Sequence, residues 1–288
     1  MTTTEIRTTD AANPGPAAPG KGGLRGTARL SKRLAVDFGA LVVLVALWQL
    51  ATSAATTPFF PTPLEIVENF GKMFFTGPPE HLFLTDAATG DVFASLWRML
   101  LGYAIGCAWG IIVGTLLGRS RAAREYTDPV VELLRSIPAT ASLPLFILVL
   151  GGGDFMRVAF IAWGVSWFVL INTASGVASI HATMLAMGRA FRVSRVRQLF
   201  GIILPAAMPK ILAGMRIGLT AALILVVTSE FMVATNGIGF QLIQAQRRFQ
   251  VLDMWTWMLL LAVLGYLLNT ILEVTEGRLL AWHRKARD

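Results

Sequence analysis

Long apolar stretches alternate with short polar segments over most of the chain. A helix that crosses a bilayer needs about 20 mostly apolar residues, and six stretches come close to or exceed this length. They are residues 36–54, 92–117, 129–150, 155–178, 211–234 and 254–274. The pattern predicts an all-α, polytopic membrane protein with six transmembrane helices.

The third stretch is the least regular of the six. Pro138 and Pro144 interrupt it, and proline removes a backbone donor and disturbs the turn that precedes it. Glu132 and Arg135 lie in its first turns, three residues apart, so the two side chains can pair on one helix face.

The chain divides into a short polar tail and one membrane domain. Residues 1–33 are rich in Thr, Ala, Pro, Gly and basic residues and lack hydrophobic periodicity, which predicts a disordered basic tail. Within it, GPAAPGKG (15–22) approaches a phosphate-binding loop, but Gly22 replaces the metal-binding hydroxyl and no strand precedes the motif. The membrane domain spans residues 34–288, and no nucleotide site is expected in either part.

Basic residues decide the predicted orientation, because cytoplasmic loops carry an excess of Lys and Arg. With the N-terminus inside, eighteen of these residues face the cytoplasm and four face outward. The four are Lys72, Arg157, Arg247 and Arg248. The pattern therefore predicts a multi-pass protein of the plasma membrane with both termini cytoplasmic. It also accounts for the formal net charge of +8 without a nucleic-acid partner.

Two short amphipathic segments are expected on the outer side: the first is a helix on the outer surface, and the second either re-enters the membrane or lies flat outside. Thr62 and Glu65 match a capping box, and Pro63 suits the first helical position of the segment that follows. The NGIG sequence at 236–239 predicts a turn, and FQLIQAQRRF comes directly after it.

Glycines recur every four residues in the second span. They form one smooth helix face that lets another helix approach closely. Static packing and a sliding contact both fit the pattern, and either requires a protein neighbour along the whole helix. The glycines are Gly102, Gly106, Gly110, Gly114 and Gly118.

Polar residues inside spans are costly and often functional. Asn172, Ser229 and Glu230 are the candidates for a translocation path. Alternatively, Glu230 reaches interfacial water or caps the loop ATNGIGF, and Asn172 and Asn269 form interhelical hydrogen bonds. No spacing typical of metal ligands and no nucleophile–base set is evident, so neither a metal site nor an enzyme is expected. The single cysteine, Cys107, excludes an internal disulfide.

A basic segment separates the fourth and fifth spans. Arginines at 189, 192, 195 and 197 accompany apolar residues at roughly helical spacing from 183 to 203. This predicts an amphipathic helix that ends at Leu204 and Pro205, because proline disfavours helix in the residue before it. Such a helix can rest on anionic lipid or dock in the groove of a cytoplasmic partner.

Residues from about 98 to 282 resemble the permease subunit of bacterial ABC importers, in the subfamily for nitrate, sulfonate, taurine and bicarbonate. The matching segments are LLRSIPATASLPLFILVLGGGDFMRVAFIAWGVSWFVLINTASGV, SRVRQLFGIILPAAMPKILAGMRIGL, NGIGFQLIQAQRRF and LEVTEGRLLAWHRK. The resemblance implies a type I importer permease fold, alternating access and a small anionic substrate such as a sulfonate, taurine or nitrate. It also implies a permease homodimer, cytoplasmic ATPase subunits that hold ATP and Mg, and an extracytoplasmic solute-binding protein.

The alternative class is a secondary transporter driven by an ion gradient. Such proteins often carry inverted repeats and intramembrane charge relays. No internal repeat is evident, and Glu230 is the one plausible deep carboxylate.

In this family the segment before Leu-Pro carries a Glu-Ala-Ala…Gly pattern and docks on the ATPase. The resemblance places a coupling segment at about 180–210, which includes Arg189, Val196, Leu204 and Pro205. It puts the family's Glu-Ala-Ala on Ala186, Met187 and Gly188, and the family's glycine on Arg192. Arginine adopts a positive φ less readily than glycine, so we expect a continuous helix at Arg192 where the family has a helix-turn-helix.

Overall fold

The computed structural model describes residues 39–54, 59–77, 85 and 87–280. The predicted tail at 1–33 lies outside these ranges, as do the last eight residues. The chain forms two compact units, Met1–Thr56 and Thr57–Asp288. The first contributes one short apolar helix, Gly39–Ala54, which lies within the first predicted span.

Every regular element of the described part of the second unit is helical, as the sequence predicts. Its α-helices are α2 (Pro63–Phe75), α3 (Phe93–Arg119), α4 (Arg121–Ser136), α5 (Leu143–Leu150), α6 (Asp154–Ala178), α7 (Ala182–Ala190), α8 (Arg195–Gln198), α9 (Leu204–Val233), α10 (Ile238–Arg247) and α11 (Val251–Leu279). Two π-helical turns, Ala87–Val92 and Leu199–Ile203, precede α3 and α9, and a 3₁₀ turn, Ala139–Ser142, precedes α5.

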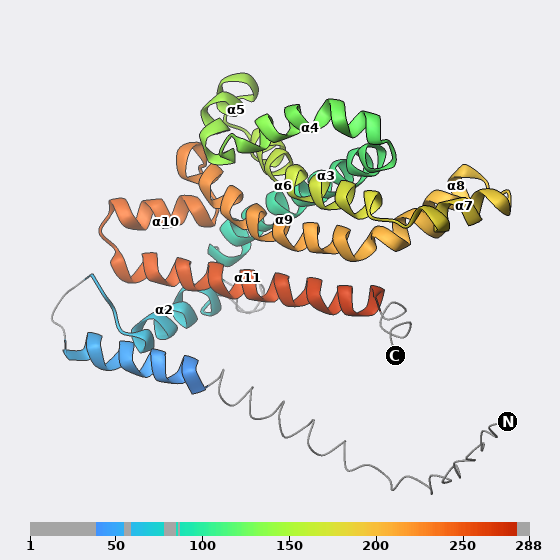
Figure 1. Ribbon diagram of the computed structural model, residues 1–288. Helices are drawn as coiled ribbons and strands as arrows, with labels where there is room; N and C mark the ends of the chain where they lie inside the picture. Colours follow the sequence, from blue (N-terminus) through green and yellow to red (C-terminus); the bar gives the residue numbers. More distant parts are fainter. Residues whose placement is uncertain (1–38, 55–58, 78–84, 86, 281–288) are drawn as a thin grey trace, which may run out of the picture. The chain divides into compact units, whose positions relative to one another are not determined.

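Helices α3, α6 and α9 pack side by side and form the centre of the unit (Figure 1). Their apolar faces meet in one core, to which α5 adds Leu143. α6 lies between its two neighbours and has the largest share of buried residues. The core contains Met99, Cys107, Leu143, Met156, Phe160, Ile161, Val165, Val169, Leu219, Ala222, Leu225 and Val226.

The glycine face of α3 lies directly against α6. A Cβ at Gly110 would lie 2.7 Å from Cβ of Val169, and one at Gly114 would lie 2.6 Å from the carbonyl oxygen of Leu170. No side chain fits at these distances without a shift of the helices. On α6, branched residues recur at the same four-residue spacing and fill the groove that the glycines leave. They are Ile161, Val165, Val169, Thr173 and Val177.

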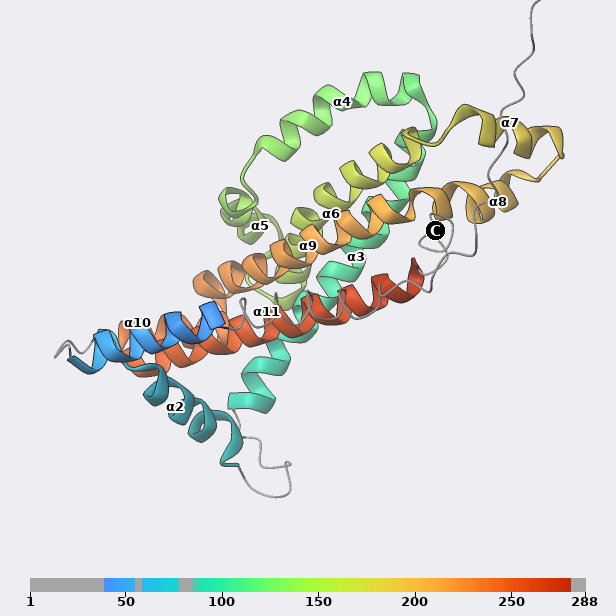
Figure 2. The same ribbon diagram turned by 60° about the horizontal axis from the view of Figure 1, so that its bottom comes forward.

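A second group of helices lies along α11. α2 and α10 pack against it (Figure 2), and the rings of Phe74 and Trp257 meet edge to face at 5.0 Å. Asn69 Nδ2 donates to Asp253 Oδ1 at 2.9 Å. Arg216 of α9 forms an ion pair with Glu276 of α11, which links this group to the central helices.

The predicted capping box begins α2. Glu65 N donates to Thr62 Oγ1 at 3.2 Å, and Thr62 N donates to Glu65 Oε2 at 2.8 Å. Pro63 occupies the first helical turn, where its missing N–H costs nothing. The sequence signal for this helix start is therefore confirmed.

The number of straight spans is smaller than predicted. Four helices in the described ranges are long and apolar enough to cross a membrane: Ala88–Arg119, Asp154–Ala178, Arg195–Val233 and Val251–Leu279. The third predicted span is instead a pair of helices, Arg121–Ser136 and Ala139–Leu150, bent by 81°. Ile137 precedes Pro138 and is extended, with φ −73° and ψ 118°, because the proline ring excludes the helical conformation there.

The first half of that bent pair is an amphipathic surface helix. α4 has no buried residue. Glu132 and Arg135 do pair on it, with Arg135 Nε 2.8 Å from Glu132 Oε2. The residues predicted to begin a span therefore form a polar helix, and the apolar part is the short α5.

Candidate functional site

Two groups of charged residues lie at the opposite ends of α3. Ser95 and Arg98 lie in its first two turns, and Arg119 is its last residue. At ~1.5 Å per residue, Ser95 and Arg119 are about 36 Å apart along the helix, whereas the hydrocarbon core of a bilayer is about 30 Å thick. The two ends of α3 can therefore reach opposite surfaces of a membrane.

The first group is a network of mostly buried side chains, here called the buried cluster; Asp154 and Asn236 lie at its solvent-exposed edge. Glu230 of α9 is its centre, and its side chain is 0% exposed. The carboxylate accepts hydrogen bonds from Ser95 Oγ at 2.8 Å, from Arg98 Nη1 at 3.1 Å and from Gly239 N at 2.9 Å. The cluster consists of Asp91, Ser95, Arg98, Asp154, Arg157, Glu230 and Asn236.

Arg98 joins the acidic members of the buried cluster. Its side chain is 3% exposed; Nε lies 2.8 Å from Asp154 Oδ1, and Nη2 donates to Asn236 Oδ1 at 2.7 Å. Arg157 binds the same Asp154 oxygen at 2.5 Å and donates to the carbonyl oxygen of Val233 at 2.9 Å. α3, α6 and α9 are therefore tied together by charges that compensate one another.

The buried cluster also holds the first turn of α10. The first N–H groups of a helix lack intrahelical acceptors and carry partial positive charge. Gly237 N donates to Asp91 Oδ1 at 2.7 Å, Ile238 N to Ser95 Oγ at 2.8 Å, and Gly239 N to Glu230 Oε2.

The two glycines of NGIG are required here for different reasons. Gly237 has φ 119°, and a Cβ on it would lie 2.5 Å from the Glu230 carboxylate. Gly239 lies against the backbone of α9, where a Cβ would meet the carbonyl oxygen of Val227 at 2.6 Å. The turn predicted from sequence is thus the point where α10 docks on α9.

The three residues predicted to line a translocation path are not brought together. Ser229 Oγ donates to the carbonyl oxygen of Val226, and Asn172 Nδ2 to that of Phe168, both within their own helices. The interhelical hydrogen bond considered for Asn172 is therefore not formed by its amide nitrogen. Glu230 binds the loop before α10, which matches the capping alternative. Because Ser229 and Glu230 are fully buried, a role in the path would require another conformation.

Most of the buried cluster has no role in the sequence-based prediction. Arg98 lies inside the predicted span at 92–117, and an ionisable residue at such a position normally has a partner. Asp154 and Arg157, three residues apart at the start of α6, gave a second signal. No group of His, Cys, Asp and Glu side chains suited to a metal ion lies in the described ranges.

The second group lies where α3 ends and where the predicted coupling segment folds. α7 is followed by a tight reversal and then by α8. Arg192 has φ 51°; Val193 N donates to the carbonyl oxygen of Gly188 at 3.0 Å, and Arg192 N to that of Arg189 at 2.9 Å. These two bonds form a Schellman motif, which ends a helix with a left-handed residue.

The prediction of a continuous helix at Arg192 is therefore wrong. The chain makes the turn with arginine in the place of glycine, although the left-handed conformation costs roughly 1–2 kcal/mol without glycine. The two hydrogen bonds offset that cost. Phe249, with φ 57°, ends α10 with the same pair of bonds, from Gln250 N to Ala245 and from Phe249 N to Gln246.

The predicted helix end at Leu204 and Pro205 is also wrong. The π-helical turn Leu199–Ile203 runs directly into α9, with Leu204 N bonded to the carbonyl oxygen of Leu199. An α-helical Pro205 would clash with the carbonyl four residues earlier, and the wider π turn displaces that carbonyl. Arg195–Val233 is consequently one helical run of 39 residues.

The α7–α8 hairpin has two different faces. Gly188 is buried between its arms, where a Cβ would lie 3.2 Å from Gln198 and Ile202. One face is an apolar groove of about 370 Å³. Met187 and Phe191 are 52% and 80% exposed there. The apolar groove is lined by Met184, Met187, Gly188, Phe191, Val193, Gly201, Ile202, Pro205 and Ala206.

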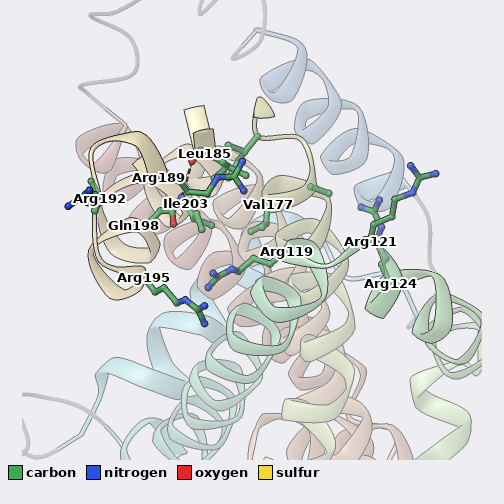
Figure 3. Close-up of a pocket in the computed structure, with 14 residues that line it drawn as sticks. Arg119, Arg121, Arg124, Val177, Leu185, Arg189, Arg192, Arg195, Gln198 and Ile203 are labelled. Carbon is green, nitrogen blue, oxygen red and sulfur yellow. Dashed lines mark hydrogen bonds between the residues drawn. The ribbon is translucent and has the colours of Figure 1, made fainter. Parts of the chain in front are cut away.

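The other face of the hairpin forms one wall of a basic pocket of about 690 Å³ (Figure 3). The end of α3 and the start of α4 form a second wall, and the end of α6 contributes to the floor. The basic pocket is lined by Gly118, Arg119, Arg121, Arg124, Val177, Ala178, Ile180, Leu185, Arg189, Arg192, Val193, Arg195, Gln198 and Ile203. It shares only Val193 with the apolar groove.

Comparisons with known proteins agree with this architecture. Residues 106–279 match the family described as binding-protein-dependent transport system inner membrane component. The taurine transport system permease protein TauC of Escherichia coli (strain K12) is 31% identical over 257 residues, 88% of this chain and 92% of TauC. The nitrate import permease protein NrtB of Synechocystis sp. is 27% identical over 244 residues, 83% of this chain and 86% of NrtB.

A solved structure is similar in fold. It is an inward-facing conformation of the MetNI methionine ABC transporter, with a TM-score of 0.57 at 20% sequence identity. The match covers 66% of this chain and 94% of the chain in that structure. The helix arrangement described above is thus similar to that of a chain of this ABC transporter.

Proposed function

The chain belongs to the family of binding-protein-dependent transport system inner membrane components, and from this premise we propose which solute it moves and how it is driven. It is the membrane-spanning permease subunit of an ATP-driven ABC importer. We propose that its solute is a small anion that carries a sulfonate or nitrate-like group. Relatives named for taurine and nitrate support this class.

Energy comes, in this proposal, from a separate ATPase subunit that binds ATP and Mg. The α7–α8 hairpin is where that subunit docks, and the observation that carries the proposal is the exposed apolar groove on it. Met187 and Phe191 lie there side by side with little protein cover. A large exposed apolar patch usually marks an interaction site.

The connection from the hairpin to α9 suits a lever. α8, the π turn and α9 are one helical run, so a displacement of the hairpin is carried along α9 without an intervening loop. At the far end of α9, Glu230 belongs to the buried cluster that holds α10. Alternating access would follow if movement of the hairpin opened and closed the contacts at that end.

The remaining partners follow from the class of transporter. We propose a permease homodimer, a solute-binding protein on the outer side and both termini in the cytoplasm. The hairpin and the end of α3 then face the cytoplasm, and the buried cluster lies near the outer surface. The ion-gradient alternative loses its basis, because the family is one of ABC importer permeases.

Cysteine cross-linking to the co-expressed ATPase tests the docking site. The native Cys107 is buried, so background reaction is low. Single cysteines at Met187 and Val196 should cross-link, whereas one at Arg248, an exposed residue after α10, should not. Absence of cross-links at both hairpin positions, with the complex intact, would contradict the docking proposal.

Uptake into proteoliposomes tests the energy source. Transport of taurine or nitrate should require the solute-binding protein and stop when the ATPase carries a hydrolysis-dead substitution. Uptake that persists with the inactive ATPase would contradict the ATP-driven mechanism.

A further inference from the structure

All but one of the arginines of the basic pocket lack a carboxylate partner within the described part of the chain. No carboxylate there forms an ion pair with Arg119, Arg124, Arg189, Arg192 or Arg195, and Arg121 pairs only with its exposed neighbour Glu125, at 2.9 Å. By contrast, Arg98, Arg135, Arg157 and Arg216 all have carboxylate partners. A concave surface lined by one sign of charge attracts an oppositely charged ligand.

The arginines come from separate segments of the chain and line one pocket. Arg119 ends α3 and Arg121 begins α4, with only Ser120 between them, and Ser120 Oγ accepts from Ala123 N at 3.1 Å to cap α4. Figure 3 shows the side chains of Arg119 and Arg195 extending toward each other, while Arg192 points outward. Arg119 and Arg195 therefore direct positive charge into the open pocket between them.

The floor of the basic pocket is apolar. It consists of Val177, Ile180, Leu185 and Ile203. The pocket volume of about 690 Å³ falls in the range of roughly 300–1,000 Å³ typical of small-ligand sites. A ligand that suits both parts has an anionic group and an apolar body.

We propose that the basic pocket binds the phosphate group of an anionic phospholipid. Guanidinium groups recognise phosphate oxygens in pairs of parallel hydrogen bonds, and Arg119 and Arg195 are placed to do so from two sides. The glycerol and first acyl carbons lie on the apolar floor. The end of a membrane-spanning helix is also where phosphate headgroups are found.

This inference rests on the proposed function in one respect, because it assigns the apolar groove to the ATPase and the basic pocket to lipid. The two surfaces share only Val193, so one hairpin can hold both at once. Lipid bound there would fix the hairpin against the ends of α3 and α6 while its other face engages the ATPase. The activity of the importer would then depend on anionic lipid.

A matched control can separate lipid binding in the basic pocket from a general attraction by net positive charge. Arg197 lies on α8 two residues from Arg195 but does not line the pocket. Arg248 is exposed at the far end of α10. The pocket variant R119Q/R195Q and the control variant R197Q/R248Q therefore remove the same charge from different places.

The experiment uses the permease purified with its ATPase in detergent, and native mass spectrometry to count bound lipid. Phosphatidylglycerol is titrated against phosphatidylcholine, and glycerol 3-phosphate serves as a soluble competitor. We expect phosphatidylglycerol to bind the parent complex preferentially. Each lost pocket arginine should weaken binding about fivefold and the pair about thirtyfold, from roughly 1 kcal/mol for each basic residue near an anionic surface. The control variant should bind like the parent.

Three results of the lipid titration would overturn the proposal. Equal weakening in the control variant would mean a general surface attraction, and unchanged binding in the pocket variant would mean that lipid binds elsewhere. Displacement of lipid by glycerol 3-phosphate at similar concentration would assign the pocket to a soluble phosphate ester.

The amount of ATPase that co-purifies separates this inference from the proposed function. The pocket variant should retain its ATPase and lose lipid, whereas Met187→Glu in the apolar groove should do the reverse. If Met187→Glu keeps its ATPase, the docking proposal fails and the lipid result stands. If the pocket variant alone loses the ATPase, its arginines bind acidic residues of that subunit and the lipid proposal fails.

Discussion

Arg98 and Arg119 lie on the same helix, and the surroundings of their guanidinium groups differ completely. Arg98 is buried and contacts Glu230, Asp154 and Asn236. Arg119 is exposed and has no carboxylate partner among the described residues. The buried cluster pairs its charges within the chain, whereas the basic pocket and the apolar groove leave arginines and apolar side chains exposed.

The difference separates stability from binding. A charge removed from a buried network leaves its partner without compensation, which is strongly destabilising. An exposed, unpaired charge contributes little to folding. Substitutions in the buried cluster should therefore reduce stability, while those at the hairpin end should change what the protein binds.

The largest expected effect is that of Arg98→Met. It leaves the fully buried carboxylate of Glu230 without its cation, so the free energy of unfolding should fall by about 3–5 kcal/mol. Asp154 is partly exposed and keeps Arg157 as a partner. Unfolding in mixed micelles measures the loss of stability. Arg119→Met is the matched control on the same helix and should stay within about 0.5 kcal/mol of the parent.

A second variant keeps this prediction testable if Arg98→Met does not fold. Arg98→Met combined with Glu230→Gln removes both charges and should be more stable than Arg98→Met alone. Equal effects of Arg98→Met and Arg119→Met would contradict the distinction between the two ends.

Gly114→Ala tests the α3–α6 contact, which lies between the buried cluster and the hairpin end of α3. The new Cβ would meet the carbonyl oxygen of Leu170 at 2.6 Å, and backbone cannot move aside as a flexible side chain can. We expect a loss of about 3 kcal/mol in the same unfolding measurement. Gly71→Ala in α2, where a Cβ meets nothing within 4 Å, should be neutral or stabilising. A harmless Gly114→Ala would mean that the α3–α6 contact is looser than described.

Glu230→Gln distinguishes a structural role from a role in transport. The Glu230 carboxylate accepts hydrogen bonds from several donors, and the amide nitrogen of glutamine cannot accept them. The free energy of unfolding should therefore fall by about 2 kcal/mol. We also expect uptake per folded complex to fall, because Glu230 connects α9 with α10. Normal uptake by the folded variant would leave Glu230 with a packing role only.

The smallest effect is expected at Arg192 and Phe249, the two residues that have a positive φ but are not glycine. Arg192→Gly and Phe249→Gly should each stabilise the protein by about 0.5–1 kcal/mol, because glycine removes most of the cost of a positive φ. ATPase binding by Arg192→Gly should be unchanged. Destabilisation by either change would mean that the side chain supports its turn through packing.

Periodicity and composition predicted the long helices well, since a span needs little more than a run of apolar residues. The glycine face and the capping box were also predictable, because each is a local sequence pattern with a fixed residue spacing. The bend at Pro138 and the π turn before Pro205 were not. Both depend on how the backbone satisfies its hydrogen bonds around a proline, and several local solutions exist.

The buried cluster and the α7–α8 hairpin were difficult to predict from the sequence for different reasons. Arg98 is far in sequence from Asp154 and Glu230 and meets them only after α3, α6 and α9 have packed, so no local pattern shows their pairing. The turn at Arg192 was missed because propensity disfavours it and two backbone hydrogen bonds outweigh propensity. That turn determines which face of the hairpin carries the apolar groove and which face carries the arginines of the basic pocket.

Hydrogen exchange of the purified permease with and without its ATPase tests the contrast between the two ends most directly. Short exposed helices exchange fast unless a partner covers them. We predict that the ATPase protects backbone amides of residues 182–203 and leaves the amides of residues 236–241, which the buried cluster already holds, protected in both states. Unchanged exchange at 182–203 in a complex shown to be intact would contradict the account.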